Sequence, residues 1–206
     1  MKRTTVFLVD DHAIMRMGLA SLLATYPEIK VLGDGGDEPS TINRILSLSP
    51  DVVIIDLIMP RLDGAEATRR LCSANPNMRV LILTTFCTSD GIANALNAGA
   101  LGAILKNADL SELLEAVRTV AAGKRFLSAE IEQIMTAEPP LPKLSERQRE
   151  VLSALARGMS NTEIAKLLGI SLPMVKEHVN ALRAKLNVAN RTEAVALALR
   201  KQLLKI

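Results

Sequence analysis

Acidic residues stand at the ends of two apolar runs in this sequence. Asp10 and Asp11 follow TVFLV (5–9), and Asp56 ends VVIID (52–56). Both runs are typical of buried strands, and the carboxyl ends of parallel strands lie at the same edge of a sheet. We therefore expect three carboxylates to meet in one shallow pocket. Their mutual repulsion there favours protonation or a bound cation.

A hydroxyl and an ammonium group are expected at the same edge. Thr84 lies at the end of RVLILTT (79–85), and Lys106 ends GAILK (102–106). Mg²⁺ prefers oxygen ligands and commonly works beside phosphate groups. The set therefore predicts a site for a phosphoryl group carried on Asp56 as the nucleophile, with Mg²⁺ and Lys106 offsetting its charge.

Each of these residues also has a simpler structural interpretation. An acid pair after a strand can cap the next helix, which is a role open to Asp11. A threonine that ends a strand is often structural, and a lysine there is usually a solvated charge. The joint placement at four strand ends favours the composite site, because a motif gains meaning from its structural context.

The pattern that positions these residues alternates strands and helices. Two of the strand-like runs are almost uninterrupted in apolar character, which predicts a parallel sheet covered by helices on both faces. The expected fold is an α/β doubly wound (βα)5 domain over residues 1–123. Its strands are expected at 5–9, 29–33, 52–56, 79–85 and 102–106, and its helices at 13–26, 41–49, 65–74, 90–100 and 109–123.

Residues 4–122 resemble a CheY-like receiver domain of a two-component response regulator. The resemblance lies in VDD (9–11), IIDLIMPRLDG (54–64), LTT (83–85) and ILK (104–106). It implies that a cognate histidine kinase phosphorylates Asp56.

The same resemblance implies a role for each residue of the pocket. Asp11 and Asp56 would bind Mg²⁺ directly and Asp10 through water, together with the backbone carbonyl of Ile58. Thr84 would hydrogen-bond one phosphoryl oxygen, and Lys106 would pair with another. The chain departs from the family at Ala103, where receivers usually carry Tyr or Phe, and at Asn107, where Pro is common.

Residues 124–142 are expected to form a linker with a short helix from Ser128 to about Met135. Pro139, Pro140 and Pro142 make its end semi-rigid. The charge balance changes at this point, because residues 139–206 hold 12 Lys/Arg and 5 Glu, a net charge of +7, whereas the whole chain has +3. This imbalance favours a polyanion as the partner of the second module.

Residues 143–206 are expected to form a small all-α helix-turn-helix domain. Helices are predicted over 145–157, 160–168, 171–186 and 190–203, with Gly169 in the tight turn. The third helix could enter a DNA major groove, where Lys reads guanine and Asn reads adenine. The face expected at DNA presents Lys176, Glu177, Asn180 and Arg183. Phosphate contacts are expected from Lys166, Arg183 and Lys185. A solvated helical bundle is the alternative.

The second module resembles a LuxR-type DNA-binding domain through LSERQREVL (144–152), VKEHV (175–179) and NRTEA (190–194). With a receiver it gives the NarL/FixJ type of response regulator. The family's base-facing positions correspond here to Lys176, Glu177 and Asn180. Met174 replaces the usual threonine, so a hydroxyl contact is lost.

These features predict a cytoplasmic transcription factor, not an enzyme, that binds double-stranded DNA as a homodimer when Asp56 is phosphorylated. No run approaches the roughly 18 apolar residues that a membrane span needs, and the start of the chain does not have the pattern of a signal peptide. The two cysteines are expected to be reduced.

Two alternative functions remain. One is a regulator that binds DNA without phosphorylation, which Ala103 would suit, and the other is a Mg²⁺-dependent hydrolase. The hydrolase is disfavoured because Ile58 stands where haloacid-dehalogenase-type phosphatases, which also use an aspartate nucleophile, carry a second aspartate as acid and base.

Overall fold

The computed structural model describes residues 3–85, 88–141 and 144–200, without the side chain of Arg200. The chain forms two compact units, Met1–Pro140 and Leu141–Ile206. Cys87 and the predicted end of the last helix near residue 203 lie outside the described residues. Within the described ranges, no helix combines the length and the apolar composition that crossing a bilayer requires.

The first unit is built on a parallel sheet with the strand order β2-β1-β3-β4-β5-β6. Register pairs Val9 of β1 with Ile55 of β3, so the two strands end side by side. Their apolar residues alternate between two cores on opposite faces of the sheet, as a strand's period of two requires. The strands are β1 (Thr4–Val9), β2 (Ile29–Gly35), β3 (Val52–Ile55), β4 (Val80–Thr84), β5 (Gly102–Leu105) and β6 (Phe126–Leu127).

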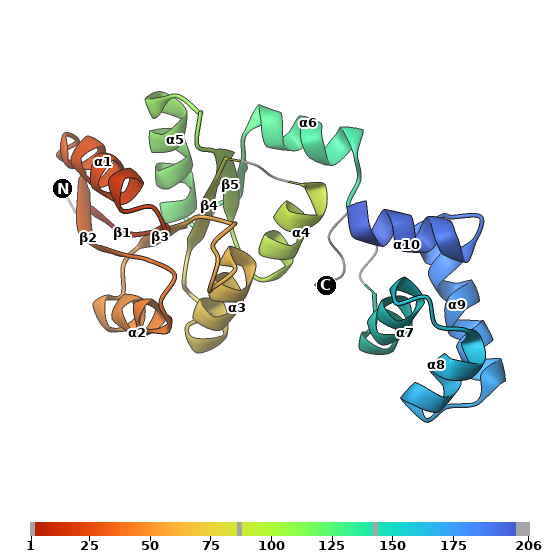
Figure 1. The fold of residues 1–206 in the computed structure, drawn as a ribbon. Coiled ribbons are helices and arrows are strands. Elements are labelled where there is room, and N and C mark those ends of the chain that lie inside the picture. The colour runs from red at the N-terminus through yellow and green to blue at the C-terminus, as the bar shows by residue number, and fades with distance from the viewer. Residues whose placement is uncertain (1–2, 86–87, 142–143, 201–206) are drawn as a thin grey trace. The chain divides into compact units, whose positions relative to one another are not determined.

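Helices cover both faces of this sheet (Figure 1). On one face, α1 (Ala13–Ala24) and α5 (Leu110–Ala121) enclose a core that contains Leu23 and Val117. The other core includes Ile45, Leu71, Ile92 and Ile131. Their helices are α2 (Pro39–Leu48), α3 (Gly64–Ala74), α4 (Ser89–Asn97) and α6 (Ala129–Ala137). The predicted doubly wound fold is confirmed.

The structure adds a sixth strand that sequence analysis left in the linker. Strand β6 pairs with β5, placing Ala103 opposite Leu127, and the amide of Ser128 donates to the carbonyl of Ala103 at 3.2 Å. Ser128 then caps α6, as predicted, by accepting a hydrogen bond from Ile131 N. Fully buried Ile131 joins the core to which Ala103 belongs, so this segment packs as part of the first unit.

The second unit contains four described helices, α7 (Glu146–Ala156), α8 (Asn161–Leu168), α9 (Leu172–Leu186) and α10 (Arg191–Arg200). Capping boxes open α7 at Ser145 and α8 at Ser160, where the sequence predicted that these helices begin. Gly169 ends α8 with φ of 63°, the left-handed conformation that glycine adopts without a steric cost. Ile164, Val175 and Leu182 bury the contact between α8 and α9. The helix-turn-helix is therefore formed as predicted.

Candidate functional site

The tips of β1 and β3 bring two buried carboxylates to one edge of the sheet. The amide of Asp56 donates to the carbonyl of Val9 at 2.8 Å, and the amide of Asp10 donates to Gly35 at 3.2 Å. Asp10 is 6% exposed and Asp56 is 5% exposed. The backbone ladders thus hold both acids at the strand ends, where the sequence pattern predicted them.

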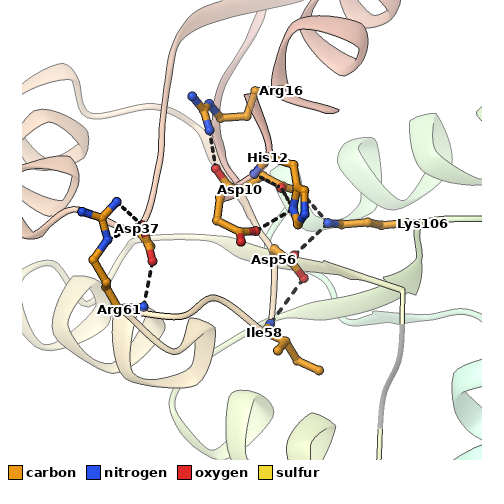
Figure 2. A network of polar contacts seen from close by, with 9 residues as sticks. Asp10, His12, Arg16, Asp37, Asp56, Ile58, Arg61 and Lys106 are labelled. Atoms are coloured by element: carbon orange, nitrogen blue, oxygen red, sulfur yellow. Dashed lines mark hydrogen bonds and ion pairs between the residues drawn. The ribbon is translucent and has the colours of Figure 1, made fainter. Parts of the chain in front are cut away.

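Lys106 joins these two acids from the end of β5. Its Nζ lies 2.5 Å from Asp10 Oδ2 and 2.7 Å from Asp56 Oδ2, and its side chain is 5% exposed. Figure 2 shows the ammonium group pointing between the carboxylates. The amide of Lys106 donates to the carbonyl of Thr84 at 2.7 Å, which places buried Thr84 beside the same strand end. Three of the predicted residues therefore make direct ionic contact.

Burial and charge act in opposite directions on this cluster. Burial raises the pKa of Asp56 above its usual value, although the hydrogen bond and attraction from Lys106 partly offset the effect. Burial alone would lower the pKa of Lys106, but its hydrogen bonds and attraction to Asp56 and Asp10 outweigh this and raise it. Lys106 therefore stays protonated. Any further positive charge nearby would stabilise the ionised form of Asp56.

Asp11 does not cap the helix that follows it. The N-cap of α1 is His12, which makes no side-chain cap, so the capping interpretation of Asp11 is wrong. Asp11 Oδ1 is buried and accepts no hydrogen bond from the described residues, although His12 Nδ1 lies 2.8 Å away. Ligand atoms of Asp10, Asp11 and His12 lie within 4.8 Å of one another. This group pairs two carboxylates with an imidazole nitrogen and does not include Asp56. The two carboxylates supply the oxygen ligands that a hard divalent cation prefers.

The loop after β3 has a shape that only glycine permits at its end. A Cβ on Gly64 would lie 2.3 Å from the carbonyl oxygen of Asp56, and the amide of Gly64 donates to Leu57 O at 2.9 Å. Ile58 N donates to Asp56 Oδ1 at 3.3 Å, while the Ile58 side chain is 61% exposed. The loop therefore folds back tightly, and the carboxylate of Asp56 lies at its start, next to the backbone of Ile58.

The predicted DNA-facing residues fall into two groups in the second unit. Lys176, Glu177 and Asn180 are exposed on α9, and Lys166 is exposed on α8. Two further cationic side chains are only partly exposed and have partners within the unit. Arg183 donates to the carbonyl of Ala189, and Lys185 donates to Gln148 Oε1 at 3.3 Å.

Sequence reasoning missed two arginines and two acids around the pocket. Arg16 Nη1 donates to the carbonyl of Asp10 at 2.6 Å, and its Nε donates to Asp34 Oδ2 at 2.7 Å. Arg61 pairs with buried Asp37. The signal was present in GDGGDE (33–38), because acids at the end of β2 must share the edge at which Asp10 and Asp56 lie.

Comparison with known proteins identifies the class. Residues 6–118 match the family model described as the response regulator receiver domain, and residues 142–198 match that of bacterial regulatory proteins of the luxR family. The chain belongs to the response regulators that combine a receiver with a LuxR-type DNA-binding domain, as predicted.

Individual relatives agree with this assignment along the whole chain. The transcriptional regulatory protein LiaR of Bacillus subtilis (strain 168) is 34% identical over 206 residues, covering 96% of this chain and 98% of the relative. The response regulator protein VraR of Staphylococcus aureus is 34% identical over 204 residues, covering 97% and 98%.

Two solved structures are similar to the whole molecule. The response regulator ChrA of a heme-sensing two-component system is 37% identical with a TM-score of 0.59, covering 99% of this chain and 100% of the other. An RcsB–DNA complex is 26% identical with a TM-score of 0.68, covering 95% and 97%.

Proposed function

We propose that Asp56 accepts a phosphoryl group from a cognate histidine kinase and that this modification controls binding of the second unit to double-stranded DNA. The observation that carries the proposal is the pairing of Lys106 with both Asp10 and Asp56 at the carboxyl edge of the sheet. Lys106 carries one positive charge beside two carboxylates, so one acid is in excess. An excess acid at a strand tip suits a group that is to be modified.

The proposed transfer is a substitution at phosphorus. A carboxylate oxygen of Asp56 attacks the phosphorus of a phosphohistidine, so a P–O bond forms and the P–N bond breaks. The electron pair and a proton remain with the imidazole. Lys106 offsets the charge of the phosphoryl oxygens, and Thr84 is proposed to hydrogen-bond one of them.

Mg²⁺ is the proposed cofactor of this site. Asp10, Asp11 and Asp56 would hold it, because carboxylate oxygens are the ligands that Mg²⁺ prefers and ligand atoms of Asp10 and Asp11 lie within 4.8 Å of one another. The ion supplies positive charge next to the transferring group. The exposed Ile58 offers no acid or base two residues after the acceptor. We therefore propose a switch protein, not an enzyme that turns over phosphoesters.

In the second unit, α9 is proposed to enter the major groove. Lys176, Glu177 and Asn180 would meet base edges, and Lys166, Arg183 and Lys185 would lie near phosphates. The RcsB structures include complexes with DNA, and the net charge of this part of the chain suits a polyanion. Reading chromosomal DNA would place the protein in the cytoplasm.

Phosphorylation is proposed to shift the receiver toward a conformation that favours a homodimer. Two linked DNA-binding units then bind paired half-sites more tightly than one unit does. In α10, Val195 packs partly against the core of its own unit, whereas Leu199 is 43% exposed. Leu199 is therefore the better candidate for a dimer contact.

The acceptor can be tested by intact mass spectrometry after incubation with acetyl phosphate and Mg²⁺. We expect one phosphoryl adduct on the wild type and none on Asp56→Asn. Absence of an adduct from the wild type would contradict the proposal. An equal adduct on Asp56→Asn would assign the acceptor to another residue.

A further inference from the structure

Asp37 is a buried carboxylate just outside the pocket. It lies in the turn between β2 and α2 and is 2% exposed. Its Oδ2 accepts a hydrogen bond from the backbone N of Arg61 at 2.7 Å, and its Oδ1 accepts one from Arg61 Nε at 3.0 Å. We call these bonds the Asp37–Arg61 clamp. They bind both the main chain and the side chain of Arg61, so the clamp fixes backbone position as well as charge.

The clamp keeps Asp37 ionised although it is buried. Burial by itself would raise the pKa of Asp37, but the hydrogen bonds and the positive charge of Arg61 outweigh burial and lower the pKa. The pKa of Arg61 is raised in return by its bonds to Asp37. A charge-assisted bond of this kind is shorter and stronger than a neutral one, which makes the clamp a firm point of attachment.

The two ends of the clamp lie on either side of the strand that carries Asp10. In the sheet, β1 lies between β2 and β3, so Asp37 reaches from the end of β2 to the loop that follows β3. Figure 2 shows this pair beside the carboxylate pocket. The clamp therefore ties together the segments that flank the tip of β1.

Arg61 belongs to the same tight loop as Asp56 and Ile58. The loop is tied to itself by the bond from Gly64 N to Leu57 O, and Leu57, Met59 and Leu62 are buried beneath it. The bond from Arg61 N to Asp37 attaches the loop to the turn that follows β2. A shift of this loop would carry the backbone next to Asp56 with it.

A second arginine, Arg16, also links an acid of the β2 region to backbone at the pocket. Arg16 donates to Asp34 of β2 and to the backbone carbonyl of Asp10, and its side chain is 17% exposed. Thus the backbone of Asp10 and the loop that follows Asp56 are both attached through arginines to acids in or just after β2. This repetition favours a positioning role over an incidental surface pair.

We propose that Asp37 and Arg61 are positioning residues for the phosphorylation of Asp56, an inference that rests on the proposed function. The clamp holds the loop 56–64 so that Asp56 and the backbone of Ile58 keep the geometry needed for a divalent cation and an incoming phosphoryl group. Neither residue touches the reacting atoms. Outer partners that orient the groups around a metal commonly change affinity or activity by about 10–100-fold when removed.

The test compares Asp37→Ala, Arg61→Ala and the control Glu38→Gln in the full chain. Asp37→Ala removes every bond of the clamp. Arg61→Ala removes the guanidinium but keeps the backbone N–H of residue 61. Glu38 contacts the same guanidinium at 3.3 Å but makes no bond to the loop backbone.

Two properties are measured below the melting temperature of every variant: Mg²⁺ affinity by calorimetric titration, and the initial rate of adduct formation from acetyl phosphate. We expect Asp37→Ala to lose about 10-fold in both, Arg61→Ala to lose less, and Glu38→Gln to match the wild type. If Asp37→Ala does not fold, Asp37→Asn replaces it. Its expected loss of Mg²⁺ affinity and of rate lies between those of Arg61→Ala and Glu38→Gln.

The outcomes separate this inference from the proposed function. A folded Asp37→Ala with wild-type Mg²⁺ affinity and wild-type rate would overturn the positioning role and leave the clamp a purely structural contact. If the wild type forms no adduct, the proposed function fails. The Mg²⁺ titration then still decides whether the clamp positions the carboxylates.

Discussion

The two units of this protein treat charge in opposite ways. In the first unit, Lys106 is almost fully buried between Asp10 and Asp56. In the second unit, Lys166 and Lys176 are exposed to solvent. Burial makes each charge depend on its neighbours, because low dielectric strengthens both attraction and repulsion. Exposed cationic groups instead remain available to a large external polyanion. They can contact its phosphates without first breaking an ion pair inside the protein.

The comparison predicts that removing a buried charge lowers stability more than removing an exposed one. Lys106→Ala leaves two buried acids without their cation, which should cost about 3–5 kcal/mol of unfolding free energy at neutral pH. Urea unfolding of the first unit measures the loss. Lys124→Ala, which removes an exposed lysine, is the matched control and should change stability by less than about 0.5 kcal/mol.

Added Mg²⁺ sharpens this first prediction. If the pocket binds a divalent cation, Mg²⁺ should restore part of the stability of Lys106→Ala, because it replaces the missing positive charge. A Lys106→Ala variant as stable as Lys124→Ala would show that burial does not couple the three groups.

In the second unit the largest effect should appear in DNA affinity and not in stability. Asn180→Ala should weaken binding to a selected DNA site by about 1–3 kcal/mol and relax the base preference at one position, since one base contact is lost. Its melting temperature should stay unchanged because Asn180 is exposed. Fluorescence anisotropy on a panel of single-base site variants provides the measurement.

Lys166→Ala should act on DNA binding in a different way. Loss of one phosphate contact should weaken binding to all sequences alike and reduce the slope of affinity against salt by about one. Titrations at several salt concentrations measure that slope. A change of base preference in this variant would place Lys166 at a base edge instead.

A helix cap offers a smaller effect that is confined to the second unit. Ser160→Ala removes the capping box of α8, in which Ser160 accepts from the amide of Glu163 at 3.3 Å. It should cost about 1 kcal/mol, seen by calorimetry as a lower transition for this unit alone. Thr162→Ala, an exposed change in the same turn, is the control. An equal shift in both variants would rule out the cap as the cause.

The smallest expected effect concerns the charge of Asp56 itself. Burial raises the pKa of this residue, so its protonated form stabilises the folded state fully below the unfolded pKa of about 3.9. That contribution is lost as pH rises through the folded pKa. Without Mg²⁺, Asp56→Asn should therefore melt slightly above the wild type at pH 7, and the gap should close as pH falls. A gap that widens on acidification would contradict the direction of the shift.

The contrast between the units also explains what could be predicted from sequence. The pocket acids and Lys106 follow from apolar runs that end in polar residues, because parallel strands fix which ends share an edge. Strand β6 could not be predicted, since two residues, Phe126 and Leu127, show no period. The Asp37–Arg61 clamp joins residues that no local pattern relates.

At two further places the structure differs from the sequence prediction because neighbouring residues compete for the same position or contact. His12 takes the N-cap position of α1, so Asp11 remains outside the cap. Asn187 ends α9 in the left-handed conformation, with φ of 52°, and in the segment that follows, the carbonyl of Ala189 accepts a hydrogen bond from Arg183. The helical pattern alone places Arg183 and Lys185 on the exposed face, whereas these contacts hold both side chains partly within the unit.

The account depends most on the link between Asp56 and the DNA-binding unit. The direct test is the affinity of the full chain for a selected DNA site, measured with and without acetyl phosphate and Mg²⁺, for the wild type and for Asp56→Asn. The account predicts tighter binding by the phosphorylated wild type and no response from Asp56→Asn. Equal affinities for the phosphorylated and unphosphorylated wild type would contradict it and would favour a regulator that reads DNA independently of its receiver.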